Sequence, residues 1–331
     1  MKRILIIFFQ ICIIVILLTS LCAMASEKKW KDTWPKEIRI GSGSLGGVSY
    51  MIGSAVANSI KEEFPDVNIT VEETKASFHN ITLVNAKEVE IGTTCTDATW
   101  EAWYGGSAFE GQKLRNFGAI LLSMPAPLMF VTLRGSGINS LADYNNQRYG
   151  AIGKGGSVAI FLDKVFKALD INVTSVYLNI GDSVQALKNG FIKGLTLAHP
   201  ATAIQELALV GDVKWLQITK EEGEKILQSH PEYSYPLIVP AGYYKGQDED
   251  LILAGLYNSI IVRDDLPEDL VYSIVEALFK HIDVIKATCP LMAQGMLPLE
   301  NVKLLTTPLH PGALKYYKEA GIEIPEKLIF K

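Results

Sequence analysis

The sequence predicts an α/β protein of two lobes that face each other across a ligand cleft. Two series of short apolar strands alternate with amphipathic helices, and each series opens with a strand, a glycine-rich loop and a helix. The segment after Val239 lacks such a loop. We therefore expect it to return to the first lobe, so that the chain crosses between the lobes twice and forms a hinge. The expected lobes are residues 36–130 with 240–331, and residues 131–239.

Composition places the chain among ordinary globular proteins. Of its 331 residues, 48% are hydrophobic and 20% are charged. This content excludes a disordered chain and a small disulfide-framework protein. The net charge of -5 argues against a nucleic-acid partner.

The N-terminus carries the pattern of an export signal. A positively charged dipeptide precedes an apolar run from Ile4 to Leu21, and small residues follow at Ala23 and Ala25. We therefore expect residues 1–25 to be a cleaved signal peptide and the mature protein to lie in the periplasm. An uncleaved membrane anchor is the alternative, because the run is near the shortest that spans a bilayer.

The first series is defined by apolar periodicity. Strands are expected where apolar residues alternate, and helices where they recur every three or four positions. The expected elements are a strand at 38–41, the glycine loop 41–47, a helix carrying Met51 to Ile60, a strand at 67–72, a helix that Ser77 can cap, and a strand at 89–94. Pro65 marks the end of the first helix.

The second series repeats the same order. Two strands, 114–122 and 128–133, are expected on either side of the Pro125-Ala126-Pro127 segment. They are followed by a strand at 149–152, the glycine loop 153–157, a helix at 158–169, a strand near Val176, a helix around 184–187, a strand at 195–198, a helix at 202–209 and a strand at 235–239. Beyond Val239 the chain is expected to be helix-rich, with a helix beginning at Pro267.

Both glycine loops are candidates for binding an anion. Glycines let the backbone approach a ligand closely, and the helix that follows presents free N–H groups and a positive dipole end. Gly41 to Gly46 matches a dinucleotide motif, which needs an acidic residue at the end of the second strand about 20 residues later. Glu62 and Glu63 lie in the expected helix instead, and Glu72 and Glu73 come about ten residues too late. The second loop lacks the spacing of a phosphate-binding P-loop. Tight turns that serve only strand-to-helix packing are the alternative reading.

The sequence shows no recognisable catalytic or metal-binding pattern. It contains no H-x-x-x-H, H-E-x-x-H, C-x-x-C or G-x-S-x-G motif. We therefore expect no enzymatic activity, no metal and no cofactor. Beyond the signal segment only Cys95 and Cys289 remain; they are expected as free thiols, with a disulfide as the alternative. His199 at a strand exit and His79 near a helix start are candidates for ligand contact.

Motifs of one protein family run through the whole mature chain in order. The opening strand leads into Gly-x-Gly and Gly-Gly-x-x-Tyr, which ends at Tyr50. Further matches are Thr74, Ser77 and Asn80, then Cys95-Thr96-Asp97, the loop 153–157, His230-Pro231 with Tyr233, the segment 244–248, Leu266-Pro267-Glu268, and His310-Pro311-Gly312-Ala313. In these motifs the chain resembles the TAXI-type solute-binding proteins of TRAP transporters.

The resemblance implies a type II periplasmic-binding-protein fold that captures a small solute and delivers it to a TRAP-type membrane permease. Members of that family bind small carboxylates and amino acids such as glutamate. The chain departs from the family at Cys95, commonly Gln, at Val158 and Ala159, commonly Gly and Thr, and at Lys75 and Ala76, commonly two glycines. These departures bear on the identity of the ligand.

A sensory subunit, or a secreted enzyme on the same fold, is the alternative function.

The expected ligand contacts lie in the glycine loops and at helix starts. They are Ser42, Gly43, Ser44, Gly47, Tyr50, Ser77, Asn80, Cys95, Thr96, Asp97, Lys154, Gly156, Ser157 and Ala201. Neutral donors dominate this set, so we expect a small organic anion or amino acid held by its carboxylate. For Asp97, capping of the next helix is the alternative. A monomer is expected to close on its ligand by hinge bending near 129–132 and 238–241.

Overall fold

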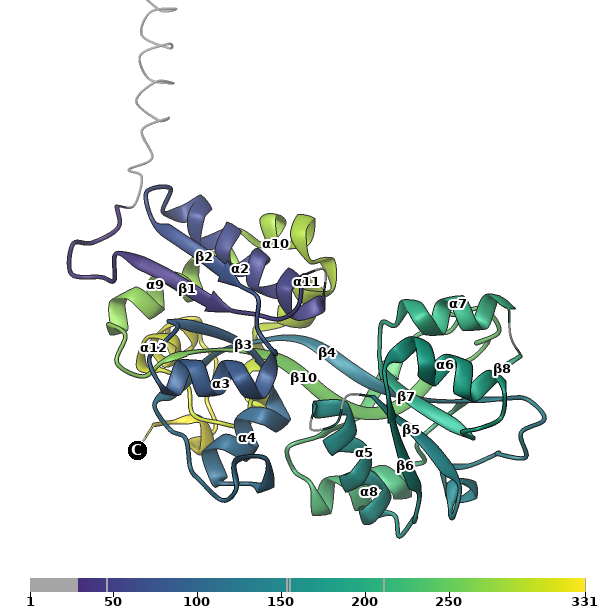
Figure 1. Ribbon diagram of the computed structural model, residues 1–331. Helices are drawn as coiled ribbons and strands as arrows, with labels where there is room; N and C mark the ends of the chain where they lie inside the picture. Colours follow the sequence, from purple (N-terminus) through teal and green to yellow (C-terminus); the bar gives the residue numbers. More distant parts are fainter. Residues whose placement is uncertain (1–28, 46, 153, 155, 211, 331) are drawn as a thin grey trace, which may run out of the picture.

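The computed structural model describes residues 29–330 except 46, 153, 155 and 211. The expected signal peptide, residues 1–25, lies outside the described residues. The described chain forms two α/β lobes connected by two long strands (Figure 1). The fold class predicted from the sequence is confirmed. Within the described ranges, no helix is both long enough and apolar enough to cross a bilayer.

The first lobe begins with three parallel strands and the helices that follow them. The elements are β1 (Glu37–Gly41), α2 (Val48–Glu63), β2 (Asn68–Glu72), α3 (Ser77–Asn85), β3 (Ile91–Cys95), α4 (Thr96–Tyr104) and a short 3-10 helix at Ser107–Phe109. β1 pairs in parallel with both β2 and β3. Ile38 and Ile40 of β1 are fully buried, as the alternating pattern predicts.

Two long antiparallel strands, β4 (Phe117–Leu133) and β10 (Leu251–Arg263), run through both lobes. β4 was expected as two strands separated by the Pro125-Ala126-Pro127 segment, and that prediction is wrong. The carbonyl oxygen of Pro127 accepts a hydrogen bond from His199 N–H at 2.8 Å, so its backbone faces β7 rather than β10. The missing N–H of Pro127 therefore costs no bond to β10, and the strand continues.

The second lobe repeats the strand-loop-helix order. Its elements are a 3-10 helix at Leu141–Tyr144, β5 (Arg148–Ile152), α5 (Ser157–Ala168), β6 (Thr174–Leu178), α6 (Ile180–Lys188), β7 (Gly194–Ala198), α7 (Thr202–Val210), β8 (Val213–Leu216), α8 (Lys220–Ser229) and β9 (Ser234–Val239). β5 pairs in parallel with β6 and β7, while β7 and β8 pair antiparallel with β4. The sequence reading missed β8 and α8. The α8 signal was the capping box that Thr219 forms with Glu222.

The second crossing between lobes lies within β10, near Gly255. Val239, Tyr244, Leu251 and Leu253 belong to a hydrophobic cluster of the second lobe, so the chain does not leave that lobe at 238–241. Residues Leu256 to Arg263 of β10 then pair with β3 and β4 of the first lobe. The segment after Val239 was expected to be helix-rich; its first regular element is this strand, and the helices follow it.

The C-terminal helices complete the first lobe. They are α9 (Glu268–Lys280), α10 (Ile282–Thr288), α11 (Pro290–Met296), a 3-10 helix at Leu299–Leu304, α12 (Pro311–Glu319) and a 3-10 helix at Glu326–Leu328. α9 begins after Pro267, as predicted. α10 packs on α2, and α12 packs on α9 (Figure 1). This part of the chain shares one hydrophobic cluster with β1 and β3.

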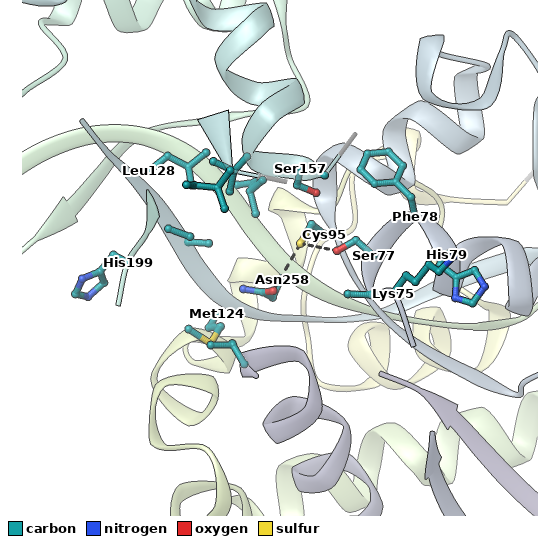
Figure 2. A pocket seen from close by; sticks show the side chains of 18 of the residues that line it. Lys75, Ser77, Phe78, His79, Cys95, Met124, Leu128, Ser157, His199 and Asn258 are labelled. Atoms are coloured by element: carbon teal, nitrogen blue, oxygen red, sulfur yellow. Dashed lines mark hydrogen bonds between the residues drawn. The ribbon is translucent and has the colours of Figure 1, made fainter. Parts of the chain in front are cut away.

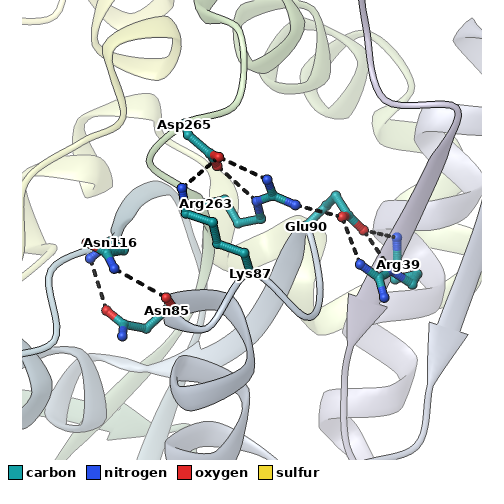
Figure 3. A network of polar contacts seen from close by, with 7 residues as sticks. All are labelled: Arg39, Asn85, Lys87, Glu90, Asn116, Arg263 and Asp265. Atoms are coloured by element: carbon teal, nitrogen blue, oxygen red, sulfur yellow. Dashed lines mark hydrogen bonds and ion pairs between the residues drawn. The ribbon is translucent and has the colours of Figure 1, made fainter.

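An ion-pair network fastens the end of β10 to the first lobe (Figure 3). The buried carboxylate of Glu90 accepts from Arg39 at 3.1 Å and from Arg263 at 3.0 Å. Arg263 and Lys87 also bind Asp265, each at 2.9 Å. The Arg263 guanidinium beside it lowers the pKa of Asp265. These residues lie at the amino ends of β1 and β3, at the opposite edge of the sheet from the glycine loop.

Candidate ligand-binding cleft

A cleft of about 600 Å³ separates the two lobes at the carboxyl ends of the parallel strands. This volume is in the range of pockets that hold small molecules. The lining residues of the first lobe are Val48, Lys75, Ala76, Ser77, Phe78, His79, Cys95, Met124, Ala126, Leu256 and Asn258. Those of the second lobe are Leu128, Ile152, Lys154, Gly156, Ser157, Val158, Ala198, His199 and Pro200. Both lobes therefore contribute to one cleft.

The start of α3 forms the first-lobe wall, and a buried hydrogen-bond network holds it in place. Asn80 Nδ2 donates to the carbonyl oxygens of Ser42 at 2.6 Å and Thr93 at 2.7 Å. Thr74 Oγ1 donates to Asn80 Oδ1 at 2.6 Å and accepts from the N–H of Ala76 at 3.0 Å. Ala76 is held at φ 61 and ψ -164, a conformation that glycine adopts far more easily. Thr74 and Asn80 thus shape the cleft without lining it.

Ser77 and Cys95 meet at the floor of the cleft (Figure 2). Ser77 Oγ lies 3.2 Å from Cys95 Sγ, and the thiol donates to Asn258 Oδ1 at 3.6 Å. Burial, with a smaller effect from the Asp97 charge, raises the pKa of Cys95 to about 12. The thiol is therefore protonated and acts as a weak donor. Ser77 was expected to cap α3, but the N-cap residue is Ala76 and the Ser77 hydroxyl faces Cys95 instead.

The start of α5 forms the second-lobe wall. Gly156 is the N-cap residue of α5, and the Ser157 hydroxyl donates across the lobes to Asp97 Oδ1 at 3.4 Å. The exposed Lys154 ammonium lies 5.8 Å from the centre of the Tyr177 ring. Lys154, Gly156 and Ser157 of the second glycine loop therefore line the cleft.

The cleft is lined by only part of the expected contact set. Ser77, Cys95, Lys154, Gly156 and Ser157 line it. The expected residues that do not line it are Ser42, Gly43, Ser44, Gly47, Tyr50, Asn80, Thr96, Asp97 and Ala201. Several of these have internal hydrogen bonds: Ser42 donates to Ser49 O at 2.7 Å, and Thr96 Oγ1 accepts from Tyr257 N–H at 3.1 Å. The Ala201 N–H likewise donates to the Tyr244 hydroxyl at 3.1 Å.

Asp97 is a buried carboxylate beneath the cleft floor. It lies in the first turn of α4, whose N-cap residue is Cys95, so it does not cap the helix, and it does not line the cleft. Its Oδ1 accepts from Ser157, while Oδ2 has no hydrogen-bond partner among the described residues. Burial raises the pKa of Asp97 to about 6.

Replacing Asp97 with asparagine is expected to stabilise the protein at pH 8 but not at pH 4. Because the folded-state pKa is raised, the folded protein binds more protons than the unfolded chain between about pH 4 and 6. The stability contributed by this group therefore falls as the pH rises through that window, by roughly 2–3 kcal/mol in total. Urea unfolding of the variant and the wild type at several pH values measures this difference.

The quantity to compare is the difference in unfolding free energy between Asp97→Asn and the wild type at each pH. Burial lowers the pKa of His199 and of His310 to about 4, which gives stability a slope of the opposite sign in both proteins. Asp66→Asn, at an exposed position, is the matched control and should show no such difference. A variant that differs from the wild type equally at every pH would contradict the prediction.

Residues of the two long strands that line the cleft were missed by sequence reasoning. The apolar Met124, Ala126 and Leu128 lie on β4, and the apolar Leu256 and the polar Asn258 lie on β10. Their pattern in the sequence is that of a buried strand, which carries no sign of a ligand site. Lys75 and His79, which the sequence reading treated as nearby candidates, both line the cleft.

Two α/β lobes that share two crossing strands and enclose a cleft define a type II periplasmic-binding-protein fold. The chain belongs to the NMT1-like family, whose model matches residues 40–321. That match covers most of both lobes.

Solved structures support the same fold. MatC from Rhodopseudomonas palustris, solved with bound malate, is 14% identical with a TM-score of 0.54, covering 87% of this chain and 98% of that chain. A TctC solute-binding protein from Polaromonas is 16% identical with a TM-score of 0.53, covering 80% of this chain and 90% of that one. At these identities the likeness shows the fold alone.

Proposed function

We propose that the protein is the extracytoplasmic solute-binding subunit of a TRAP-type (TAXI) secondary transporter. It captures a small carboxylate or amino acid in the cleft and delivers it to a membrane permease. The observation that carries the proposal is the cleft itself, to which Lys75 and Ser77 come from one lobe and Lys154 and Ser157 from the other. An anion held between these groups contacts both lobes at once.

We expect the two lobes to close on the ligand, because groups from both lobes line the cleft. A ligand that touches both walls gains contacts only when the lobes approach, so it favours the closed state. The connection between the lobes is the pair of strands β4 and β10, which are continuous through the crossing. The MatC and TctC neighbours, whose names describe bound malate and solute binding, support the same role.

Binding of a small organic acid is expected to stabilise the mature protein and to make it more compact. A ligand at a hundredfold excess over its Kd raises the free energy of unfolding by about 2.7 kcal/mol. A thermal-shift panel of carboxylates, sulfonates and amino acids identifies the ligand. Small-angle scattering at saturation should then show a smaller radius of gyration. No change in the radius of gyration at proven saturation would contradict hinge closure.

Delivery is tested separately from binding. Uptake of the identified ligand into proteoliposomes that contain a TRAP-type permease from the same organism should require this protein and no ATP. Uptake that requires ATP would assign the protein to another class of transporter, while leaving the binding role intact.

A further inference from the structure

The cleft lining combines polar and apolar groups. Lys75, Ser77, Phe78 and His79 come from the turn before α3 and its first residues, and Figure 2 shows them on one side of Cys95. Met124, Leu128 and His199 lie on the other side in the same view. The remaining apolar lining residues include Ile152, Val158 and Leu256. A ligand that fills the cleft therefore needs a polar head and an apolar body.

The cleft lining offers positive charge from both lobes. Lys75 and Lys154 are both exposed, so a ligand anion can reach each ammonium group. A carboxylate or a sulfonate head can accept hydrogen bonds from these ammonium groups.

A ligand ammonium group has no counter-charge in this cleft. Among the described residues that line it there is no Asp or Glu. The carboxylate beneath the floor, Asp97, is fully buried, and Asn258 Oδ1 already accepts from the Cys95 thiol. An amino acid would have to leave its ammonium without a carboxylate partner among apolar side chains, which is costly.

His199, on the other side of Cys95 in Figure 2, adds no positive charge to the lining. His199 Nδ1 lies 3.0 Å from the Tyr244 hydroxyl, and burial lowers the pKa of His199 to about 4. The imidazole is therefore neutral at physiological pH. Met124 and Leu128 beside it offer only apolar contact.

We propose that the cleft selects organic anions that have a carboxylate or sulfonate head, an apolar body and no ammonium group, and that it discriminates against amino acids. The inference rests on the proposed function and narrows the ligand of that same cleft. The selectivity comes from what the walls offer: cations at the head, aliphatic side chains along the body, and no acidic side chain among the described lining residues.

The test is calorimetry on the mature protein with a matched series of six-carbon and shorter solutes. Across acetate, butanoate and hexanoate, affinity should rise about fourfold with each added methylene, because each is buried against an apolar wall. Norleucine differs from hexanoate by one ammonium group and should bind about tenfold more weakly or worse. Hexane-1-sulfonate tests whether the head can be a sulfonate.

A lysine variant tests the placement of the head. Lys75→Ala should weaken hexanoate binding about three- to tenfold, while Lys61→Ala, an exposed lysine on α2 away from the cleft, should leave it unchanged. Norleucine, malate or glutamate binding as tightly as hexanoate would overturn this inference and leave the proposed function standing. Binding of none of these solutes would overturn both.

Discussion

Lys164→Met is expected to open the cleft and to weaken ligand binding. Lys164 lies on α5 of the second lobe, and its Nζ is 2.5 Å from Glu101 Oε1 on α4 of the first lobe. The same ammonium is 2.6 Å from Glu232 Oε1 in the second lobe. The pKa of Lys164 is raised overall. Burial lowers this pKa, but the hydrogen bonds to Glu101 and Glu232, together with their charges, raise it by more. One cation thus joins two carboxylates across the lobes.

The expected loss of affinity in Lys164→Met is large because the carboxylates of Glu101 and Glu232 are buried. The side chains of Glu101 and Glu232 are 5% and 2% exposed, so removal of the cation leaves two desolvated negative charges close together. Breaking a buried ion pair from one side costs about 3–5 kcal/mol. Separation of the lobes relieves part of that cost by hydrating Glu101, so the open state gains population. Ligand affinity should then fall by roughly tenfold to a hundredfold.

Calorimetry and small-angle scattering measure the two consequences in Lys164→Met. Lys167→Met, an exposed lysine one turn along the same helix, is the matched control and should behave as the wild type. Adding Glu101→Gln to Lys164→Met should restore part of the lost affinity, since it removes one of the uncompensated charges. Wild-type affinity and compactness in Lys164→Met would show that this contact does not hold the lobes together.

The order of strands, loops and helices was predictable because it depends on local periodicity. The alternation in β1 and the apolar face of α2 are visible in short windows of sequence. β10 was not predictable in this way. It is a nearly continuous apolar run, buried on both sides, and such a run carries neither the helical nor the alternating period. The second crossing was misplaced for the same reason.

The candidate site was predictable where it depends on loops and not where it depends on distant strands. Ser77 and Ser157 follow recognisable turns, and both line the cleft. Met124 and Leu256 reach it only because β4 and β10 pass under the floor, a long-range arrangement with no local signature. Asn80 shows the opposite error: its motif suggests ligand contact, but its amide donates to two backbone carbonyls. A sequence motif alone does not tell whether a residue contacts the ligand or holds a nearby loop in place.

Gly255→Ala is expected to destabilise the fold by about 2–4 kcal/mol, because it widens the crossing of the two long strands. A β-carbon at Gly255 would lie 2.3 Å from the carbonyl oxygen of Ala126 and 2.9 Å from the α-carbon of Pro127. Both atoms belong to the backbone of β4, which cannot move aside as a flexible side chain would. β4 pairs with β10 on one side and with β7 on the other, so a shift would disturb both lobes.

Urea unfolding of Gly255→Ala beside Gly181→Ala separates this contact from the general effect of replacing glycine. At Gly181 in α6, the nearest atom to an added β-carbon is 3.6 Å away, which is ordinary contact. Alanine should therefore be tolerated there, with a small gain from helix propensity. An unfolding midpoint for Gly255→Ala equal to the wild type would mean that β4 and β10 can separate locally at little cost. If the midpoint falls as expected, the crossing needs glycine at this position, because no other residue lets the two backbones approach so closely.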